Sequence, residues 1–333
     1  MRTRRSQSSS DPVSSGHPPA FVGAGHVPVL LQETLDSLSL VPDDCVVDAT
    51  LGGAGHAGAI AGRLGKKGVL IGFDLDADAV ARAKKVLEGA RPDVHLIPGN
   101  FRHLGKELER LRIPSITKAL FDLGMSSYQL DSYSGLPAEA SAQAGRGFSF
   151  RADEPLSMTY ADTPTGLTAA TIVNEWGEES IADILFGWGE EHYSRRIAKA
   201  IVERRLHKPF TTSVELAEAI KAAVPPRYRH GRIHPATRTF QALRIAVNDE
   251  LGALTEGLRA AWEHLAPRGR IAVITFHSIE DRMVKHMFAA WEASGEGKRP
   301  VKKPIRPSDE EVSMNPRSRS AKLRVIEKVV HRP

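Results

Sequence analysis

The residues best suited to chemistry lie at a glycine-rich turn near the start of the chain. A short apolar run ends at Asp48, and residues 52–55 contain three glycines. A second apolar run ends at Asp74, 19 residues after Gly55. Glycine allows a main chain to approach a ligand closely, and a strand-end carboxylate can accept hydrogen bonds from two ribose hydroxyls. The pattern therefore predicts a nucleotide-binding crevice.

The order of residues in this turn bears on which nucleotide binds. The usual dinucleotide fingerprint, G-x-G-x-x-G, leaves a helix N-terminus free for pyrophosphate. Here Asp48 precedes the glycines, and its negative charge would repel pyrophosphate but attract the sulfonium and ammonium groups of S-adenosylmethionine. The turn favours this methyl donor over NAD. Two alternatives stay open at this point: an NAD-dependent Rossmann oxidoreductase, and a doubly wound domain whose glycines only form a tight turn.

Polar residues also follow two later apolar runs. Asp122 ends one of them, and Ser126 and Ser127 come shortly afterwards. His277 follows another, where it could be a base or a substrate contact, although a histidine there more often makes a structural hydrogen bond. Open α/β sheets bind ligands at the carboxyl ends of their strands, so these side chains are expected beside the glycine turn.

A long amphipathic helix is predicted from residue 234 onward. Its apolar stripe comprises Phe240, Leu243, Val247, Leu251, Leu254, Leu258, Trp262 and Leu265. Arg238 and Arg244 lie off this stripe and could face the crevice. Further along the chain, Asp281 and Arg282 could simply pair with each other.

Composition sets the broad class. The 333 residues are 41% hydrophobic and 26% charged, which is typical of a soluble globular protein, and no apolar run approaches the roughly 20 residues of a membrane span. Cys45 is the only cysteine, so a disulfide framework and an all-cysteine metal site are excluded, and a reducing cytoplasm is expected. Methylation at carbon 5 of a pyrimidine is disfavoured, because it needs a cysteine nucleophile and Cys45 starts a strand that should be buried.

The order of elements predicts an α/β fold with a helical insertion. Strands are expected at 45–50, 69–74, 94–98, 119–123, 270–276 and 323–330, and helices at 77–87, 104–111, 168–176, 179–188, 193–206 and 213–224. Strands and helices alternate up to about residue 123, as in a parallel sheet, and no strand is predicted between 128 and 232. The predicted domains are a disordered tail (1–24), a methyltransferase domain in two parts (25–132 and 233–333), and a helical insertion (133–232) that recognises RNA.

Positive charge is concentrated in two segments. The net charge of +5 permits a nucleic-acid partner without requiring one. The first cluster comprises Arg195, Arg196, Lys199, Arg204, Arg205, Lys208, Lys221, Arg227, Arg229 and Arg232, and the second comprises Lys298, Arg299, Lys302, Lys303 and Arg306. Each could be a solvated helix face, but together they favour a phosphate-binding surface, with Arg195, Arg196, Arg204 and Arg205 expected to contact RNA. A non-catalytic RNA-binding protein would carry such clusters without needing Asp74 or Asp122.

Several uncommon strings in one order give the chain a specific resemblance. They are residues 25–31 (GHVPVLL), 52–56 (GGAGH), 122–131 (DLGMSSYQLD), 146–150 (RGFSF), 189–191 (GEE), 234–241 (HPATRTFQ), 276–282 (FHSIEDR) and 315–320 (NPRSRS). With these strings, which run from about Gly25 to Glu327, the chain closely resembles the bacterial 16S ribosomal RNA (cytosine-N4)-methyltransferases of the RsmH family, formerly called MraW.

The resemblance implies a Rossmann-like S-adenosylmethionine-dependent methyltransferase that modifies N4 of a cytidine in the decoding region of 16S ribosomal RNA. It also implies a cytoplasmic enzyme with no membrane partner. The positions implied for the donor are Ala54, Gly55, His56, Asp74, Phe101, Asp122 and Gln129. Chemical reasoning adds Asp122 as the residue that orients the amine, and the candidates for substrate contact are Ser126, Ser127, Arg238 and His277. No metal site is predicted, and the oligomeric state is left open, with a homodimer as one alternative.

Three features depart from the family pattern, one of which is that the segment between Asp131 and Arg146 looks longer than in some relatives. Relatives often have glycine where this chain has Ala54, so the local backbone geometry is in question. The tail before Gly25 lies outside the resemblance.

Overall fold

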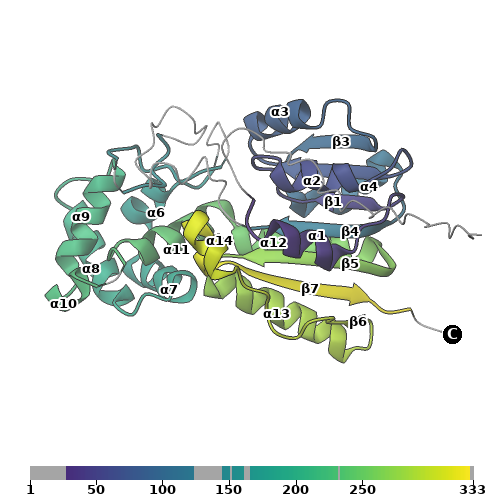
Figure 1. Ribbon diagram of the computed structural model, residues 1–333. Helices are drawn as coiled ribbons and strands as arrows, with labels where there is room; N and C mark the ends of the chain where they lie inside the picture. Colours follow the sequence, from purple (N-terminus) through teal and green to yellow (C-terminus); the bar gives the residue numbers. More distant parts are fainter. Residues whose placement is uncertain (1–27, 124–144, 151, 161–165, 232, 331–333) are drawn as a thin grey trace, which may run out of the picture.

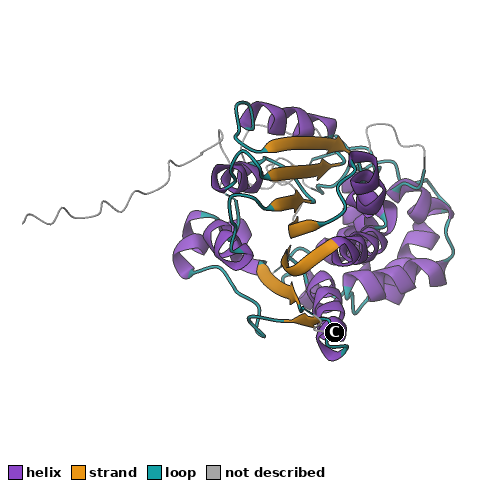
Figure 2. Ribbon diagram, turned by 90° about the vertical axis from the view of Figure 1, so that its right-hand side faces the viewer, coloured by secondary structure: helices purple, strands orange, loops and turns teal. Residues whose placement is uncertain are grey.

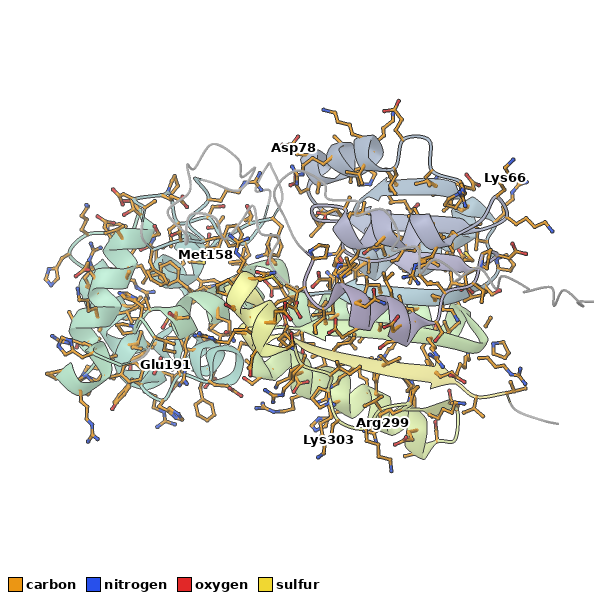
Figure 3. All side chains as sticks on the ribbon, viewed as in Figure 1. Lys66, Asp78, Met158, Glu191, Arg299 and Lys303 are labelled. Atoms are coloured by element: carbon orange, nitrogen blue, oxygen red, sulfur yellow. The ribbon has the colours of Figure 1, made fainter. Side chains whose placement is uncertain are left out.

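The computed structural model describes residues 28–123, 145–150, 152–160, 166–231 and 233–330. It consists of a body built on a β-sheet and a second, helical body (Figure 1). We use "helical body" for the described residues between 145 and 247. Figure 3 places Met158 and Glu191 in the helical body and Lys66 and Asp78 in the sheet body.

Seven strands form one mixed sheet in the order β3-β2-β1-β4-β5-β7-β6. They are β1 (Cys45–Asp48), β2 (Val69–Asp74), β3 (Asp93–Pro98), β4 (Ile116–Asp122), β5 (Leu265–Thr275), β6 (Gly297–Lys298) and β7 (Lys322–Lys328). The first five strands are parallel, and β7 runs antiparallel to both β5 and β6. All six predicted strands are present, and β6, which has only two residues, was not predicted.

Helices cover both faces of this sheet (Figure 2). One core contains residues of α1 (Leu31–Leu38), α2 (Gly55–Arg63) and α3 (Ala77–Val86). The opposite core contains residues of α4 (Leu104–Leu111), α12 (Glu250–His264) and α13 (Ser278–Ala293). A short 3-10 helix, η1 (Phe101–His103), precedes α4, while α14 (Asp309–Met314) and η4 (Pro316–Ser320) precede β7. Within the described residues, no helix combines the length and apolar character that a membrane span requires.

The helical body has a hydrophobic core of its own. Its helices are α6 (Ala169–Glu175), α7 (Glu178–Gly189), α8 (Ser194–Arg205), α9 (Ser213–Ala223), α10 (Pro226–Arg229) and the first part of α11 (Thr237–Asn248). Threonine caps start two of these helices, because Thr168 Oγ1 accepts from the Thr171 N–H and Thr212 Oγ1 accepts from the Glu215 N–H. The core extends along α11 as far as Leu243, beyond the predicted boundary at residue 232, and the division into domains stays a prediction.

The single long helix predicted from residue 234 is wrong. The chain forms α11 and α12, separated at Asp249, which has left-handed backbone angles (φ 46°, ψ 46°). The two halves serve different cores: Phe240 and Leu243 pack in the helical body, and Leu254 and Leu258 pack on the sheet. The apolar stripe is continuous in the sequence, but the helix is interrupted where the chain passes from the helical body to the sheet body.

Candidate active site

The glycine turn lies where the sheet changes its direction of winding. The strands that follow β1 and β4 lie on opposite sides of this pair, so β1 and β4 meet at the switch point where open α/β sheets bind ligands. The turn is attached to both neighbours of β1, because Ala49 N–H donates to Leu120 O on β4 and Leu51 N–H donates to Phe73 O on β2. Residues 49–56 are thereby fixed at the carboxyl edge of the sheet, as predicted.

Asp74 is oriented by this turn. One carboxylate oxygen accepts from the Gly52 N–H at 2.8 Å and the other from the Asp76 N–H at 2.9 Å. Burial raises the pKa of Asp74, although the same two hydrogen bonds act in the opposite direction. Each oxygen keeps a further lone pair, so the side chain is held in place with acceptor capacity left for the two hydroxyls of a ribose.

Ala54 occupies the position where the family pattern often has glycine. It is the N-cap of α2 and has left-handed backbone angles (φ 60°, ψ 19°), and its side chain is buried. Ala54, which departs from the family pattern, is therefore a non-glycine residue with a strained, left-handed backbone. The next residue needs to be glycine for a different reason, because a Cβ on Gly55 would lie 2.3 Å from Pro28 Cγ.

We expect the substitution Ala54→Gly to stabilise the protein. An L-residue in the left-handed region costs roughly 1 kcal/mol, and glycine removes most of that cost. Urea unfolding should show a rise in the free energy of unfolding. The control is Ala59→Gly in the right-handed part of α2, which should lower it by a similar amount. A fall in stability for Ala54→Gly would contradict the assignment of strain.

Asp122 ends β4 beside the turn and is held by two neighbours. Its N–H donates to Thr50 Oγ1 at 2.8 Å, and its carboxylate lies 3.5 Å from His56 Nδ1. The other ring nitrogen of His56 lies 3.2 Å from the Val29 carbonyl oxygen. If Nε2 donates to that carbonyl, Nδ1 can donate to Asp122 only in the protonated imidazole. Thr50 was not singled out in the sequence, although its position directly after the strand-end Asp48 was a usable signal.

Asp48, which the sequence suggested as a fixed negative charge, is removed from solvent. Its side chain is fully buried, and one carboxyl oxygen accepts from the Thr50 N–H. Burial raises the pKa of Asp48 to about 8, with further contributions from the charges of Asp122 and Asp74 and opposition from the Thr50 hydrogen bond. Burial thus disfavours the charged form of Asp48, so repulsion of pyrophosphate by Asp48 does not by itself separate the methyl donor from NAD.

Phe101 lies in η1, directly after β3 and a short turn. Its ring contacts the edge of Phe121 on β4, with ring centroids 5.5 Å apart. On its other side is α12, where a Cβ on Gly257 would lie only 2.5 Å from Phe101 Cδ2. The ring is partly exposed at the same edge of the sheet as Asp74 and Asp122, which suits the predicted contact with the donor.

His277 is the N-cap of α13. Its Nδ1 accepts from the Glu280 N–H at 3.3 Å, and Glu280 accepts in return from the His277 N–H. The structure thus shows the hydrogen-bonded role, and a contact between His277 and substrate stays a prediction. Burial raises the pKa of Glu280, but His277 and Arg244 outweigh this effect and bring the pKa below its usual value.

Arg244, which the sequence suggested could face the crevice, is paired with a neighbouring acid, and an orientation toward the crevice stays a prediction. Its guanidinium makes two 2.8 Å hydrogen bonds to the carboxylate of Glu250, which also accepts from the Tyr160 hydroxyl. Glu250, His277 and Glu280 place potential metal ligands within 4.8 Å of one another. In this cluster Arg244 already supplies the positive charge that would balance the carboxylates.

The remaining polar residues named in the sequence analysis differ in what the structure shows for them. Arg238 donates to the Glu190 carbonyl oxygen and so joins α11 to the end of α7, and a contact with substrate stays a prediction. Asp281 and Arg282 do not pair with each other, because Asp281 binds two basic side chains of β7 and Arg282 binds Glu190. Ser126, Ser127 and Gln129 lie outside the described residues.

Cys45 lies at the opposite edge of the sheet from this site, at the start of β1. Burial raises the pKa of its thiol to about 11, with a smaller contribution from the charge of Asp44. A thiol with so little thiolate at neutral pH, at the wrong edge of the sheet, is unsuited to attack a pyrimidine ring.

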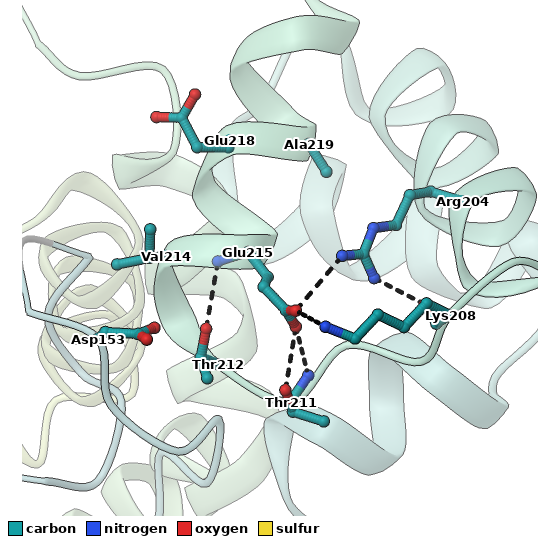
Figure 4. Close-up of a pocket in the computed structure, with 9 residues that line it drawn as sticks. All are labelled: Asp153, Arg204, Lys208, Thr211, Thr212, Val214, Glu215, Glu218 and Ala219. Atoms are coloured by element: carbon teal, nitrogen blue, oxygen red, sulfur yellow. Dashed lines mark hydrogen bonds and ion pairs between the residues drawn. The ribbon is translucent and has the colours of Figure 1, made fainter.

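An open pocket in the helical body is separate from the predicted donor site (Figure 4). Its lining combines Arg204 and Lys208 with three acidic residues, and Glu215 forms ion pairs with both bases. Neighbouring hydrogen bonds, chiefly those from Lys208 and Thr211, lower the pKa of Glu215 to about 2. This pocket carries no excess of positive charge, and of the residues predicted to bind donor or RNA it contains only Arg204.

The fold and the site define an S-adenosylmethionine-dependent methyltransferase of the open α/β type, with a reversed β7 and two strand-end acids around a glycine turn. The model of the MraW methylase family matches residues 23–329. The ribosomal RNA small subunit methyltransferase H of Heliobacterium mobile is 46% identical over 321 residues, covering 91% of this chain and 99% of that protein. The protein of the same name from Clostridioides difficile is 42% identical over 319 residues, with coverage of 91% and 99%. The chain belongs to the MraW methylase family.

Proposed function

We propose that this protein transfers the methyl group of S-adenosylmethionine to N4 of a cytidine in the decoding region of 16S ribosomal RNA. The observation that carries the proposal is the placement of Asp74 and Asp122 on either side of one glycine turn at the switch point of the sheet. The names of the relatives support ribosomal RNA as the substrate. The choice of N4 and of the decoding region rests on the family resemblance.

The chemistry requires placement of a weak nucleophile. The exocyclic amine attacks the methyl carbon in line with the departing sulfur, so an N–C bond forms, an S–C bond breaks and the amine loses one proton. The lone pair of the amine nitrogen is delocalised into the ring. A group that accepts hydrogen bonds from the amine makes this lone pair available for attack on the methyl carbon. Asp122 is suited to this task, because its main chain is held by Thr50 and its side chain is 23% exposed beside His56.

The helical body supplies exposed positive charge for RNA, but from fewer residues than expected. Arg195 and Arg196 are exposed on α8. Arg205 instead donates to the carbonyl oxygens of Val173 and Trp176. Arg204 is also occupied within the body, where it pairs with acidic and carbonyl oxygens and stacks on a phenylalanine. We therefore restrict the proposed phosphate contacts in this helix to its first turn.

Reversing the charges of Arg195 and Arg196 to glutamate should weaken RNA binding and leave donor binding unchanged. If each arginine contacts one phosphate, the slope of log affinity against log salt should fall by about 1 to 2. The matched control is Lys66→Glu with Lys67→Glu, which makes the same charge change on exposed residues of the sheet body. Equal losses in both double variants would mean that net charge, and not this surface, governs RNA affinity.

The proposed reaction is tested most directly by mapping methylated cytidines. Small-subunit RNA from cells with and without this protein is digested and analysed by mass spectrometry, and one N4-methylcytidine should disappear with the protein. A thermal shift with S-adenosylmethionine but not with NADH would separate the proposal from the oxidoreductase alternative. An unchanged set of methylated cytidines would contradict it. The cytoplasmic location and the homodimer stay predictions.

A further inference from the structure

Three consecutive residues at the junction of α11 and α12 are bound by two different parts of the protein. Asn248 accepts from the Tyr160 N–H and donates to the Met158 carbonyl oxygen, both in the helical body. Asp249 binds the guanidinium of Arg102. Glu250, the third residue, binds the buried Arg244 of α11. The junction is therefore held from the helical body on one side and from the sheet body on the other.

Arg102 connects the junction to the segment predicted to contact the donor. It directly follows Phe101, and it also binds Glu256 on α12, with Nε 3.2 Å from the carboxylate. Phe101 itself is packed against Gly257 of the same helix so closely that a methyl group would not fit between them. Phe101 and Arg102 therefore both contact α12, within its first two turns.

The junction also has the features of a pivot. Asp249 has a left-handed backbone, which costs a residue other than glycine roughly 1 kcal/mol. Single residues of this kind persist where their surroundings hold them, and they occur where two bodies change their relative angle. Here α11 packs in the core of the helical body and α12 packs on the sheet, so rotation at Asp249 would turn one body against the other.

We propose that Arg102 is a positioning residue that couples donor binding to RNA binding. The proposal rests on the proposed function for the identity of both ligands. A donor that binds against Phe101 restricts the Phe101–Arg102 segment. The ion pairs of Arg102 then restrict the α11–α12 junction. The backbone angles at this junction determine the orientation of the helical body relative to the sheet body. RNA then binds more tightly to the donor-loaded protein than to the empty protein.

Such coupling has a measurable size and must be reciprocal. Couplings between two sites typically change affinity roughly 5- to 150-fold, and each ligand must change the affinity of the other by the same factor. The probe is the small ribosomal subunit from cells that lack this protein. The donor is replaced by S-adenosylhomocysteine, so that no methyl transfer occurs during the measurement.

The experiment compares the affinity of the full-length protein for these subunits with and without saturating S-adenosylhomocysteine. The wild-type ratio should be at least about 5, and Arg102→Ala should bring it close to 1 while RNA affinity without cofactor changes little. Arg110→Ala removes a comparable exposed ion pair, that with Glu107 on α4, and should keep the wild-type ratio. Asp249→Asn, which retains tolerance for a left-handed backbone but loses the charge, should resemble Arg102→Ala.

Two results would overturn the proposal. One is a wild-type ratio of 1, and the other is a full wild-type ratio in Arg102→Ala. Both leave the proposed function intact if the cytidine is still methylated, because methylation does not require that the two ligands bind cooperatively. Loss of the methylated cytidine from the mapping experiment tests the proposed function separately. A merely structural role for Arg102 would lower both affinities by similar factors and leave their ratio unchanged.

Discussion

Replacing Asp74 with alanine should weaken the binding of S-adenosylmethionine on the order of 10- to 100-fold. The substitution removes charge-assisted hydrogen bonds to two ribose hydroxyls, each stronger than a neutral hydrogen bond. Isothermal titration calorimetry with S-adenosylmethionine measures the change. The carboxylate also holds the Gly52 N–H, so part of the loss could arise from a disturbed turn.

A second ligand separates these two causes. An S-adenosylhomocysteine analogue that lacks both ribose hydroxyls should bind wild type and Asp74→Ala with similar affinity, because the contacts removed by the substitution are then absent from both complexes. Asp76→Ala is the protein control, since Asp76 caps α3 and its side chain binds Asp78 N–H and Arg82. Unchanged affinity of Asp74→Ala for the natural donor would remove Asp74 from the donor site.

Asp122→Asn should lower the single-turnover rate of methyl transfer about 100-fold and change donor affinity much less. Asparagine keeps the size and one acceptor oxygen of aspartate but loses its negative charge. That charge stabilises the amine hydrogens as positive charge develops on the nitrogen during methyl transfer. Single-turnover assays with assembled small subunits report the rate of transfer, and calorimetry reports donor affinity.

The matched control for this substitution is Asp93→Asn. Asp93 is exposed at the opposite edge of the sheet, at the start of β3, and undergoes the same chemical change. It should transfer methyl groups at the wild-type rate. Near-normal turnover in Asp122→Asn would exclude Asp122 from the chemistry and direct attention to Ser126, Ser127 and His277.

The site residues that could be predicted were those whose roles depend on local order along the chain. Asp74 and Asp122 end apolar runs, and because parallel strands present their carboxyl ends at one edge, residue type and spacing were enough to place both at the crevice. Ala54 could be recognised as a departure because relatives often have glycine there, and the structure adds that its backbone is left-handed. The burial that raises the pKa of Asp48 depends on the strands on either side of it, and the charge pattern alone did not indicate it.

What could not be predicted depends on contacts between distant segments. Asp249 interrupts a continuous apolar stripe because α11 and α12 serve different cores, and its partner Arg102 lies 147 residues earlier in the chain. Arg205 looked like part of a basic surface, but two carbonyl oxygens near the end of α6 bind it. Charge and periodicity along the sequence do not show which distant side chain will contact a residue. Ion pairs and helix breaks that depend on such contacts therefore could not be predicted from the sequence.

The position of the helical body along the chain also has a consequence for how the sheet forms during synthesis. Strand β4 is finished at Asp122, but its neighbour β5 begins only at Leu265, after roughly 140 further residues. At typical elongation rates this interval is on the order of ten seconds, during which the edge of β4 has no partner strand. The helical body can bury its own core in that time, because that core ends before β5. The helical body can therefore fold before β5 pairs with β4, and until then the open edge of β4 can pair wrongly.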